Sequence, residues 1–165
     1  MEFKVGDKAV VPNLGVGVCT ERTSIDVEGE PYEVFVFEIM QTKNNQPTKY
    51  TVPVDSVGAN AVRDLIPLDA IERVYDILRD KETPADKQTW NRRYREYLQK
   101  INSGDPFEVA SVLRDLARLK TEKTLSFGER KMFDQAHSLL VQEIAVARDV
   151  TEQVIAGELE AIFNS

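Results

Sequence analysis

A change in the period of the apolar residues near Leu65 is the feature that most constrains the fold of this chain. Before Leu65, apolar residues alternate within short runs separated by Gly, Pro, Asn and Asp, which is typical of β-strands joined by turns. After Leu65, they recur at helical spacing over long runs, which is typical of amphipathic helices. We therefore predict an α+β protein, with a small β-module over residues 1–64 and an all-helical module of about five helices over residues 65–165.

The first module contains several runs with strand character. Residues 8–12 and 15–21 are expected to form two strands around a turn, residues 32–40 form the strongest predicted strand, and residues 49–54 give a further one. Both faces of the run 32–40 are largely apolar, so this strand is expected to lie in the interior of the module. Short strands at this density predict a small, strongly bent β-barrel with Cys19 in its core.

Helix-start signals divide the second module. Asp105 and Pro106 open one helix, and Ser126 has a Glu three residues later, which is the spacing of a capping box. Thr89 and Thr151 are further candidate N-caps. The predicted helices span residues 68–79, 90 to about 102, 107 to about 120, 127 to about 149, and 152 onwards.

The residue types present disfavour several kinds of chemistry. A single Cys allows no disulfide within the chain, and a single His, His137, allows no metal site that needs two histidines. No apolar run is long enough to span a bilayer, and the N-terminus lacks the apolar core of a secretory signal. We therefore expect a cytoplasmic protein that is not an enzyme, with no cofactor, no bound metal and no membrane contact.

Charge is distributed unevenly along a chain whose net charge is −7. Residues 87–131, which we call the basic island, hold 11 Lys and Arg against 6 Asp and Glu, a net charge of +5; the remaining residues therefore carry −12. Clustered basic side chains are the electrostatic footprint of phosphate binding, and the alternative is a solvated charged face. Because the rest of the chain repels phosphate, we expect a weak DNA contact that another protein must deliver.

The basic island begins with one aromatic residue and three arginines. Arg92 and Arg95 are expected to project away from the apolar stripe that contains Trp90, and Arg93 is expected at the flank of that stripe. Trp90 has two interpretations. The sequence favours a core or rim aromatic in register with Tyr94, and the alternative is an apolar wedge for a minor groove or an unpaired base. Further cations would join this face if three helices packed side by side: Arg114, Arg118, Lys120, Lys123, Arg130 and Lys131.

Several segments together resemble the CarD/CdnL family of bacterial transcription regulators. They span nearly the full chain and comprise residues 3–7, 10–12, 15–17, 89–97, 103–104, 112–116 and 125–132. The runs Trp-Asn-Arg-Arg-Tyr and Leu-Ser-Phe-Gly-Glu-Arg-Lys are specific, whereas the N-terminal module is shared with transcription–repair coupling factors. The chain lacks helicase motifs, so it is similar to the stand-alone regulator.

The resemblance implies a Tudor-like barrel that docks on the β subunit of RNA polymerase, and a helical domain that contacts promoter DNA at the upstream edge of the bubble. The family's tryptophan, here Trp90, would act as a wedge against the minor groove, with basic neighbours on the DNA backbone. The DNA-contacting residues that it implies are Trp90, Arg92, Arg93, Arg95, Phe127, Arg130 and Lys131. The polymerase-contacting residues that it implies are Val36, Thr51, Val52 and Pro53; some members carry basic residues at the positions of Ile25 and Thr51.

The residues and the resemblance together predict a transcription-initiation regulator that binds the polymerase β subunit and stabilises the open promoter complex. The alternative is a non-catalytic adaptor whose helical domain binds another regulatory protein instead of DNA. A monomer is expected, with a domain-swapped dimer as the alternative.

Overall fold

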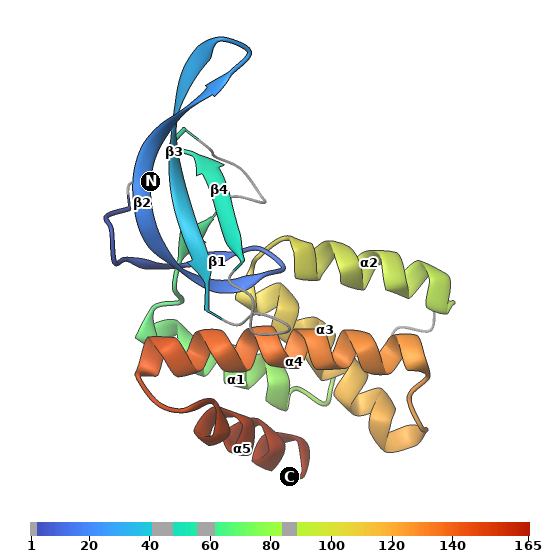
Figure 1. Ribbon diagram of the computed structural model, residues 1–165. Helices are drawn as coiled ribbons and strands as arrows, with labels where there is room; N and C mark the ends of the chain where they lie inside the picture. The colour runs from blue at the N-terminus through green and yellow to red at the C-terminus, as the bar shows by residue number, and fades with distance from the viewer. Residues whose placement is uncertain (1–2, 41–47, 56–61, 84–88) are drawn as a thin grey trace. The chain divides into compact units, whose positions relative to one another are not determined.

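The computed structural model describes residues 3–40, 48–55, 62–83 and 89–165. The chain divides into two compact units, Met1–Leu65 and Ile66–Ser165, and each unit has its own hydrophobic core. The first unit is built from strands and the second from helices, which confirms the predicted α+β class (Figure 1). Among the described helices, none is both long and apolar enough to cross a membrane.

The first unit is a five-stranded antiparallel sheet with the strand order β4-β3-β2-β1-β5. The strands are β1 (Lys8–Val11), β2 (Gly15–Val27), β3 (Glu30–Ile39), β4 (Lys49–Pro53) and β5 (Arg63–Asp64). Within the described residues the sheet is an open ladder, because β4 pairs only with β3 and β5 pairs only with β1. Among the described strands, none pairs with the outer edge of β4, and an unpaired edge can accept an additional strand.

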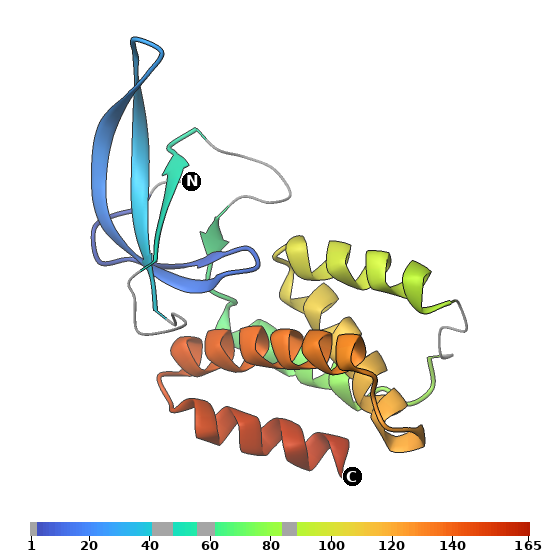
Figure 2. The ribbon, with the colours of Figure 1, turned by 45° about the vertical axis from the view of Figure 1, so that its right-hand side comes forward.

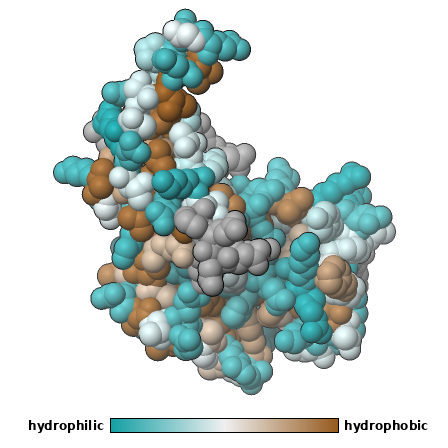
Figure 3. Space-filling model, viewed as in Figure 1, coloured by the Kyte–Doolittle hydropathy of each residue, from teal (hydrophilic) through white to brown (hydrophobic). Residues whose placement is uncertain are grey.

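The hairpin of β2 and β3 is longer than the sequence predicts, and its end extends beyond the other strands as a two-stranded ribbon (Figures 1 and 2). The expected end of the second strand at residue 21 is wrong, since β2 continues through a bulge to Val27. Glu28 and Gly29, both with positive φ (53° and 84°), close the ribbon, as in a two-residue type I′ turn. The sequence does not predict the ribbon, because both of its faces are largely exposed. Without a buried face, its residues need not alternate between apolar and polar. Figure 3 accordingly shows hydrophobic and hydrophilic residues intermixed along it.

Three phenylalanines form the centre of the first core. Phe3 packs edge-to-face on Phe35 and Phe37, with ring centroids 5.6 Å and 5.2 Å apart. Cys19 is buried among them, as predicted, and burial raises the pKa of its thiol. This core makes the sheet a rigid platform for the residues on its other face.

The second unit contains five α-helices in its described residues, in agreement with the sequence (Figures 1 and 2). They are α1 (Ile71–Arg79, preceded by the short 3₁₀-helix η2, Leu68–Ala70), α2 (Trp90–Asn102), α3 (Pro106–Glu122), α4 (Phe127–Arg148) and α5 (Glu152–Phe163). The helix α3 packs against α1, α2 and α4, and α5 packs against α1 and α4. Their apolar stripes meet in one core whose fully buried members include Ile101, Leu113, Leu116, Leu140, Ile144, Ile155 and Leu159.

Three of the predicted helix caps are present. The Asp105 carboxylate accepts a hydrogen bond from the Phe107 N–H at 2.8 Å, Thr151 caps α5, and Ser126 forms a complete capping box with Glu129. Thr89 precedes α2 at the predicted position, but its side chain makes no capping hydrogen bond. Its backbone carbonyl accepts hydrogen bonds from the N–H groups of Arg92 and Arg93, at the end of the first turn of the helix. Thr89 is therefore the N-cap residue by position, as predicted, but its hydroxyl does not cap the helix.

Candidate nucleic-acid and protein interfaces

The starts of α2 and α4 lie against each other, although they are far apart in the sequence. A Cβ added to Gly128 would lie 3.5 Å from both Cζ2 and Nε1 of Trp90, so the indole rests against this glycine. The two most specific runs of the sequence, around Trp90 and around Gly128, therefore form one surface. We call this surface the indole surface; it consists of residues 90–95 of α2 and 127–131 of α4.

Trp90 lies at the rim of the helical core. Its side chain is half-buried, packs against the core, and has ring centroids 5.8 Å from Tyr94 and 6.5 Å from the buried Tyr97. The interpretation as a rim aromatic therefore describes how the ring is anchored. The residue stays partly exposed, so it remains accessible to a ligand.

Arg93 faces the protein interior. Only 15% of its side chain is exposed, its Nη2 lies 3.7 Å from Oε2 of Glu129, and its Cζ lies 5.5 Å from the centroid of the Trp90 ring. A guanidinium in this position is paired with a carboxylate and stacked on an aromatic ring. An ion pair within the chain therefore already engages the charge of Arg93, and its contact with phosphate stays a prediction.

Glu129 is the buried partner of this arginine. Its side chain is only 1% exposed, and its Oε1 accepts hydrogen bonds from Lys123 Nζ and from the Ser126 N–H, each at 2.9 Å. Burial acts to raise the pKa of the carboxyl, but the Ser126 N–H and the Lys123 ammonium outweigh it and the pKa is lowered. Glu129 is thus a buried carboxylate. The capping-box spacing predicts its contact with Ser126, but no local pattern predicts its pairing with Arg93.

The remaining predicted DNA contacts are exposed. Phe127, the first residue of α4, exposes 84% of its surface, and its spacing places it on one helical face with Arg130 and Lys131. Arg92 and Arg95 are exposed on α2. Within the described part of the chain, no ion pair is formed by any of these four cations. The indole surface therefore presents free positive charge on both sides of its aromatic residues.

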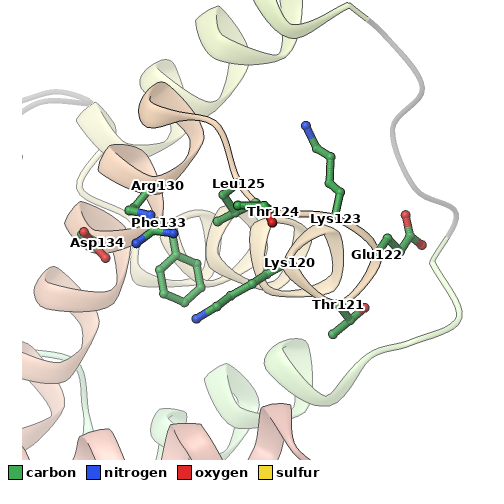
Figure 4. Close-up of a pocket in the computed structure, with 9 residues that line it drawn as sticks. All are labelled: Lys120, Thr121, Glu122, Lys123, Thr124, Leu125, Arg130, Phe133 and Asp134. Atoms are coloured by element: carbon green, nitrogen blue, oxygen red, sulfur yellow. The ribbon is translucent and has the colours of Figure 1, made fainter.

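A groove of about 480 Å³ borders this surface at the turn between α3 and α4 (Figure 4). Lys120, Lys123 and Arg130 line it together with Phe133, and the ammonium of Lys120 lies 5.2 Å from the centroid of the Phe133 ring. His137 stacks on the same ring, with centroids 6.0 Å apart, and burial lowers the pKa of its imidazole. The side chain of His137 is half-buried on α4.

Two other cations of the basic island do not belong to this surface. Arg114 is 13% exposed and pairs with Asp115 at 3.0 Å and with Asp80 at 3.5 Å. Arg118 donates a hydrogen bond of 2.6 Å to the carbonyl oxygen of Thr83. Both arginines therefore hold the segment that follows α1, and the expectation that they join the phosphate-binding face is wrong.

The predicted polymerase-contacting residues divide between the two faces of the sheet. Val36 is paired with Thr51, and Pro53 lies opposite Val34, so the side chains of these residues share one face. The exposed pair of Ile25 and Tyr32 continues the same face along the hairpin. This face is the candidate protein interface.

Val52 is opposite Phe35, and its side chain, 7% exposed, belongs to the core. Its side chain points away from the face of Val36 and Pro53, because successive residues of a strand point to opposite faces, and its contact with the polymerase stays a prediction.

The hydrogen bonds at the two ends of β4 define which backbone groups reach its outer edge. The Ile39 N–H donates to the Thr48 carbonyl at 2.9 Å, and the Val54 N–H donates to the Glu33 carbonyl at 3.0 Å. Alternation along an antiparallel pair then directs the backbone groups of residue 52 towards β3 and those of Thr51 away from it. Thr51 therefore offers an N–H and a C=O to an added strand, whereas Pro53 offers only a C=O.

The described residues thus combine two modules, one with a strand edge that no described strand pairs with and one with a basic, aromatic surface. The model of the CarD C-terminal domain matches residues 73–160, more than half of the chain, and the chain belongs to the CarD family. It is also similar to the "Putative transcription factor YdeB" of Bacillus subtilis (strain 168), with 29% identity over 153 residues, which cover 93% of this chain and 97% of that protein. The chain is a transcription regulator.

Proposed function

We propose that this protein binds the β subunit of RNA polymerase through the outer edge of β4 and stabilises the open promoter complex through the indole surface. The observation that carries the proposal is the convergence of the half-buried Trp90 with the exposed Phe127 and with four exposed cations at the starts of α2 and α4, which form no ion pair with any residue that the structure describes. An anchored aromatic ring flanked by Arg and Lys suits a DNA junction, where a groove edge or an unpaired base meets two phosphate backbones.

The DNA contact is weak on its own in this proposal. The exposed cations are few, and the residues outside the basic island carry a net charge of −12, which opposes the approach of phosphate at low salt. Docking on the polymerase turns the DNA contact into an intramolecular event, so that effective concentration replaces intrinsic affinity.

Docking through β4 follows the physics of strand addition. Main-chain hydrogen bonds supply affinity, and side chains on one face supply specificity. Thr51 provides the backbone groups at the edge, and Val36 and Pro53 provide the neighbouring face. Because Ile25 and Thr51 replace the basic residues of some family members, docking here depends more on strand pairing and apolar contact.

The regulatory effect is a shift of population. A wedge that binds the opened junction better than the closed duplex favours the open state by that difference in affinity alone. A difference of about 1.4 kcal/mol raises a small open population roughly tenfold.

The test replaces Trp90 by Ala and measures the lifetime of heparin-challenged open complexes together with binding to purified polymerase. We expect a shorter lifetime and unchanged polymerase binding. Phe107→Ala is the matched control, because Phe107 is also a half-buried ring at the start of a helix, with an Arg73 guanidinium 4.6 Å from its centroid, and it lies outside the indole surface. An unchanged lifetime for the Trp90 variant refutes the wedge.

A second measurement separates this proposal from an adaptor function. A photocrosslinker placed at Arg92 should label promoter DNA only when polymerase is present, and less so at high salt. Crosslinks to a protein alone would instead support the adaptor.

A further inference from the structure

Glu129 places a negative charge in the middle of a surface that we propose binds phosphate. The capping box does not require this charge, because a Gln at the same position accepts the Ser126 N–H equally well. Oε1 carries the cap and the contact with Lys123. Oε2 is buried and forms no hydrogen bond within the described residues. It forms the ion pair with Arg93. The charge of Glu129 therefore has a role outside the cap.

Arg93 connects this carboxylate to the indole. Its guanidinium lies between Glu129 Oε2, at 3.7 Å, and the Trp90 ring, whose centroid is 5.5 Å from Cζ. Its Nε is buried and has no hydrogen-bond partner among the described residues, so the ion pair and the ring determine where the guanidinium lies. The indole in turn also contacts Gly128 and the rings of Tyr94 and Tyr97.

We propose that Glu129 and Arg93 are positioning residues: the buried carboxylate holds the guanidinium against Trp90 and thereby fixes the direction in which the exposed part of the indole faces. The consequence for DNA rests on the proposed function, whereas the orientation of the ring is a property of the free protein. In this proposal, the arginines near Trp90 have two different roles, although the sequence suggests a single one for all of them. Arg93 orients the indole, and the exposed Arg92, Arg95, Arg130 and Lys131 meet phosphate.

Orientation matters because a ring that must be ordered on binding binds more weakly than one already held in place. Ordering one side chain at an interface weakens affinity by roughly two- to tenfold. Loss of the ion pair should therefore shorten the lifetime of the open complex by about that factor, without any loss of a phosphate contact.

Trp90 is the only Trp in the chain, so intrinsic fluorescence reports its environment directly. In the free protein, Glu129→Gln and Arg93→Met should each increase quenching by acrylamide and lower the fluorescence anisotropy. Gln keeps the capping acceptor, and Met keeps an apolar stem over the ring. The double variant should show no further increase, because both substitutions break the same link.

Glu143→Gln is the matched control. Glu143 is also a buried glutamate on α4, and it accepts the Ile66 N–H at 2.8 Å. It should leave the fluorescence of Trp90 unchanged. All variants are compared under conditions where urea titrations show them fully folded.

The effect on the open complex has opposite signs under the two explanations. Glu129→Gln makes the surface more positive by one charge, so electrostatic attraction alone would lengthen the lifetime of the complex. Positioning predicts a shorter lifetime. Unchanged fluorescence in both single variants overturns the inference, whatever the promoter assay shows. A lengthened lifetime in Glu129→Gln, while Trp90→Ala shortens it, overturns it as well. An unchanged lifetime in Trp90→Ala refutes the wedge and leaves the fluorescence result to decide the positioning role.

Discussion

Replacing Thr51 by Pro tests whether the outer edge of β4 docks on the polymerase. Thr51 directs its N–H away from β3, so Pro removes no hydrogen bond from the sheet, and an edge strand tolerates it. The substitution deletes the N–H that would donate to an added strand. A carbonyl of the partner then loses its donor in a desolvated interface, which costs about 1 to 3 kcal/mol. This corresponds to roughly 5- to 150-fold weaker binding at 25 °C.

Biolayer interferometry with immobilised polymerase measures this loss on the full chain. Thr51→Val is the matched variant, because Val keeps the backbone N–H and the β-branched shape, and surface changes of this size alter binding by no more than about twofold. Urea unfolding establishes that both variants retain the sheet. Binding of Thr51→Pro with wild-type affinity, on an intact sheet, would show that β4 is not the docking strand and that the argument from hydrogen-bond alternation fails.

Three further outcomes follow from the same structure. Pro53→Arg places a charge on the face of Val36 and should reduce retention in a polymerase pull-down; equal retention counts against docking through this face. Val52→Ala opens a cavity in the first core and should lower the free energy of unfolding by about 1 to 3 kcal/mol, whereas an effect on polymerase binding alone would place Val52 back in the interface. Burial lowers the pKa of His137 from 6.5, so the unfolded chain takes up this proton first as the pH falls. The contribution of His137 to the free energy of unfolding should therefore be full above about pH 6.5 and decrease as the pH drops towards the folded pKa. Urea titrations of His137→Gln at several pH values should lack this decrease.

Features that depend on near neighbours in the sequence could be predicted. The cap at Asp105 and the box between Ser126 and Glu129 each involve residues at most three positions apart, so their spacing alone identifies them. The change from strand to helix periodicity predicts both modules, because each apolar face must be buried by its own unit. The extension of β2 to Val27 could not be predicted, since an exposed ribbon is stabilised by backbone pairing that leaves little pattern in the side chains.

Ion pairs between residues far apart in the sequence determine which cations stay exposed. No local sequence pattern predicts those pairs. Arg92 and Arg93 are adjacent and chemically identical, yet one is exposed and the other is held by Glu129. Only the packing of α2 against the start of α4 distinguishes them. Likewise, nothing local indicates that Asp80 would engage Arg114. A count of basic residues therefore overestimates how many are available to phosphate.

The ion pairs within the chain also limit the strength of the DNA contact that we propose. Of the eleven Lys and Arg of the basic island, Arg93, Lys123, Arg114 and Arg118 have partners within the chain. On the indole surface itself, four exposed cations form no ion pair among the described residues: Arg92, Arg95, Arg130 and Lys131. Four phosphate contacts give a salt slope no steeper than about −3.6, shallower than that of a protein that binds DNA unaided through 6 to 10 contacts. In the proposed function, tethering to the polymerase raises the occupancy of this surface on DNA, and the aromatic ring supplies its preference for the opened junction. For this reason an ion pair that removes one cation from the surface to orient that ring can strengthen regulation even as it weakens attraction to DNA.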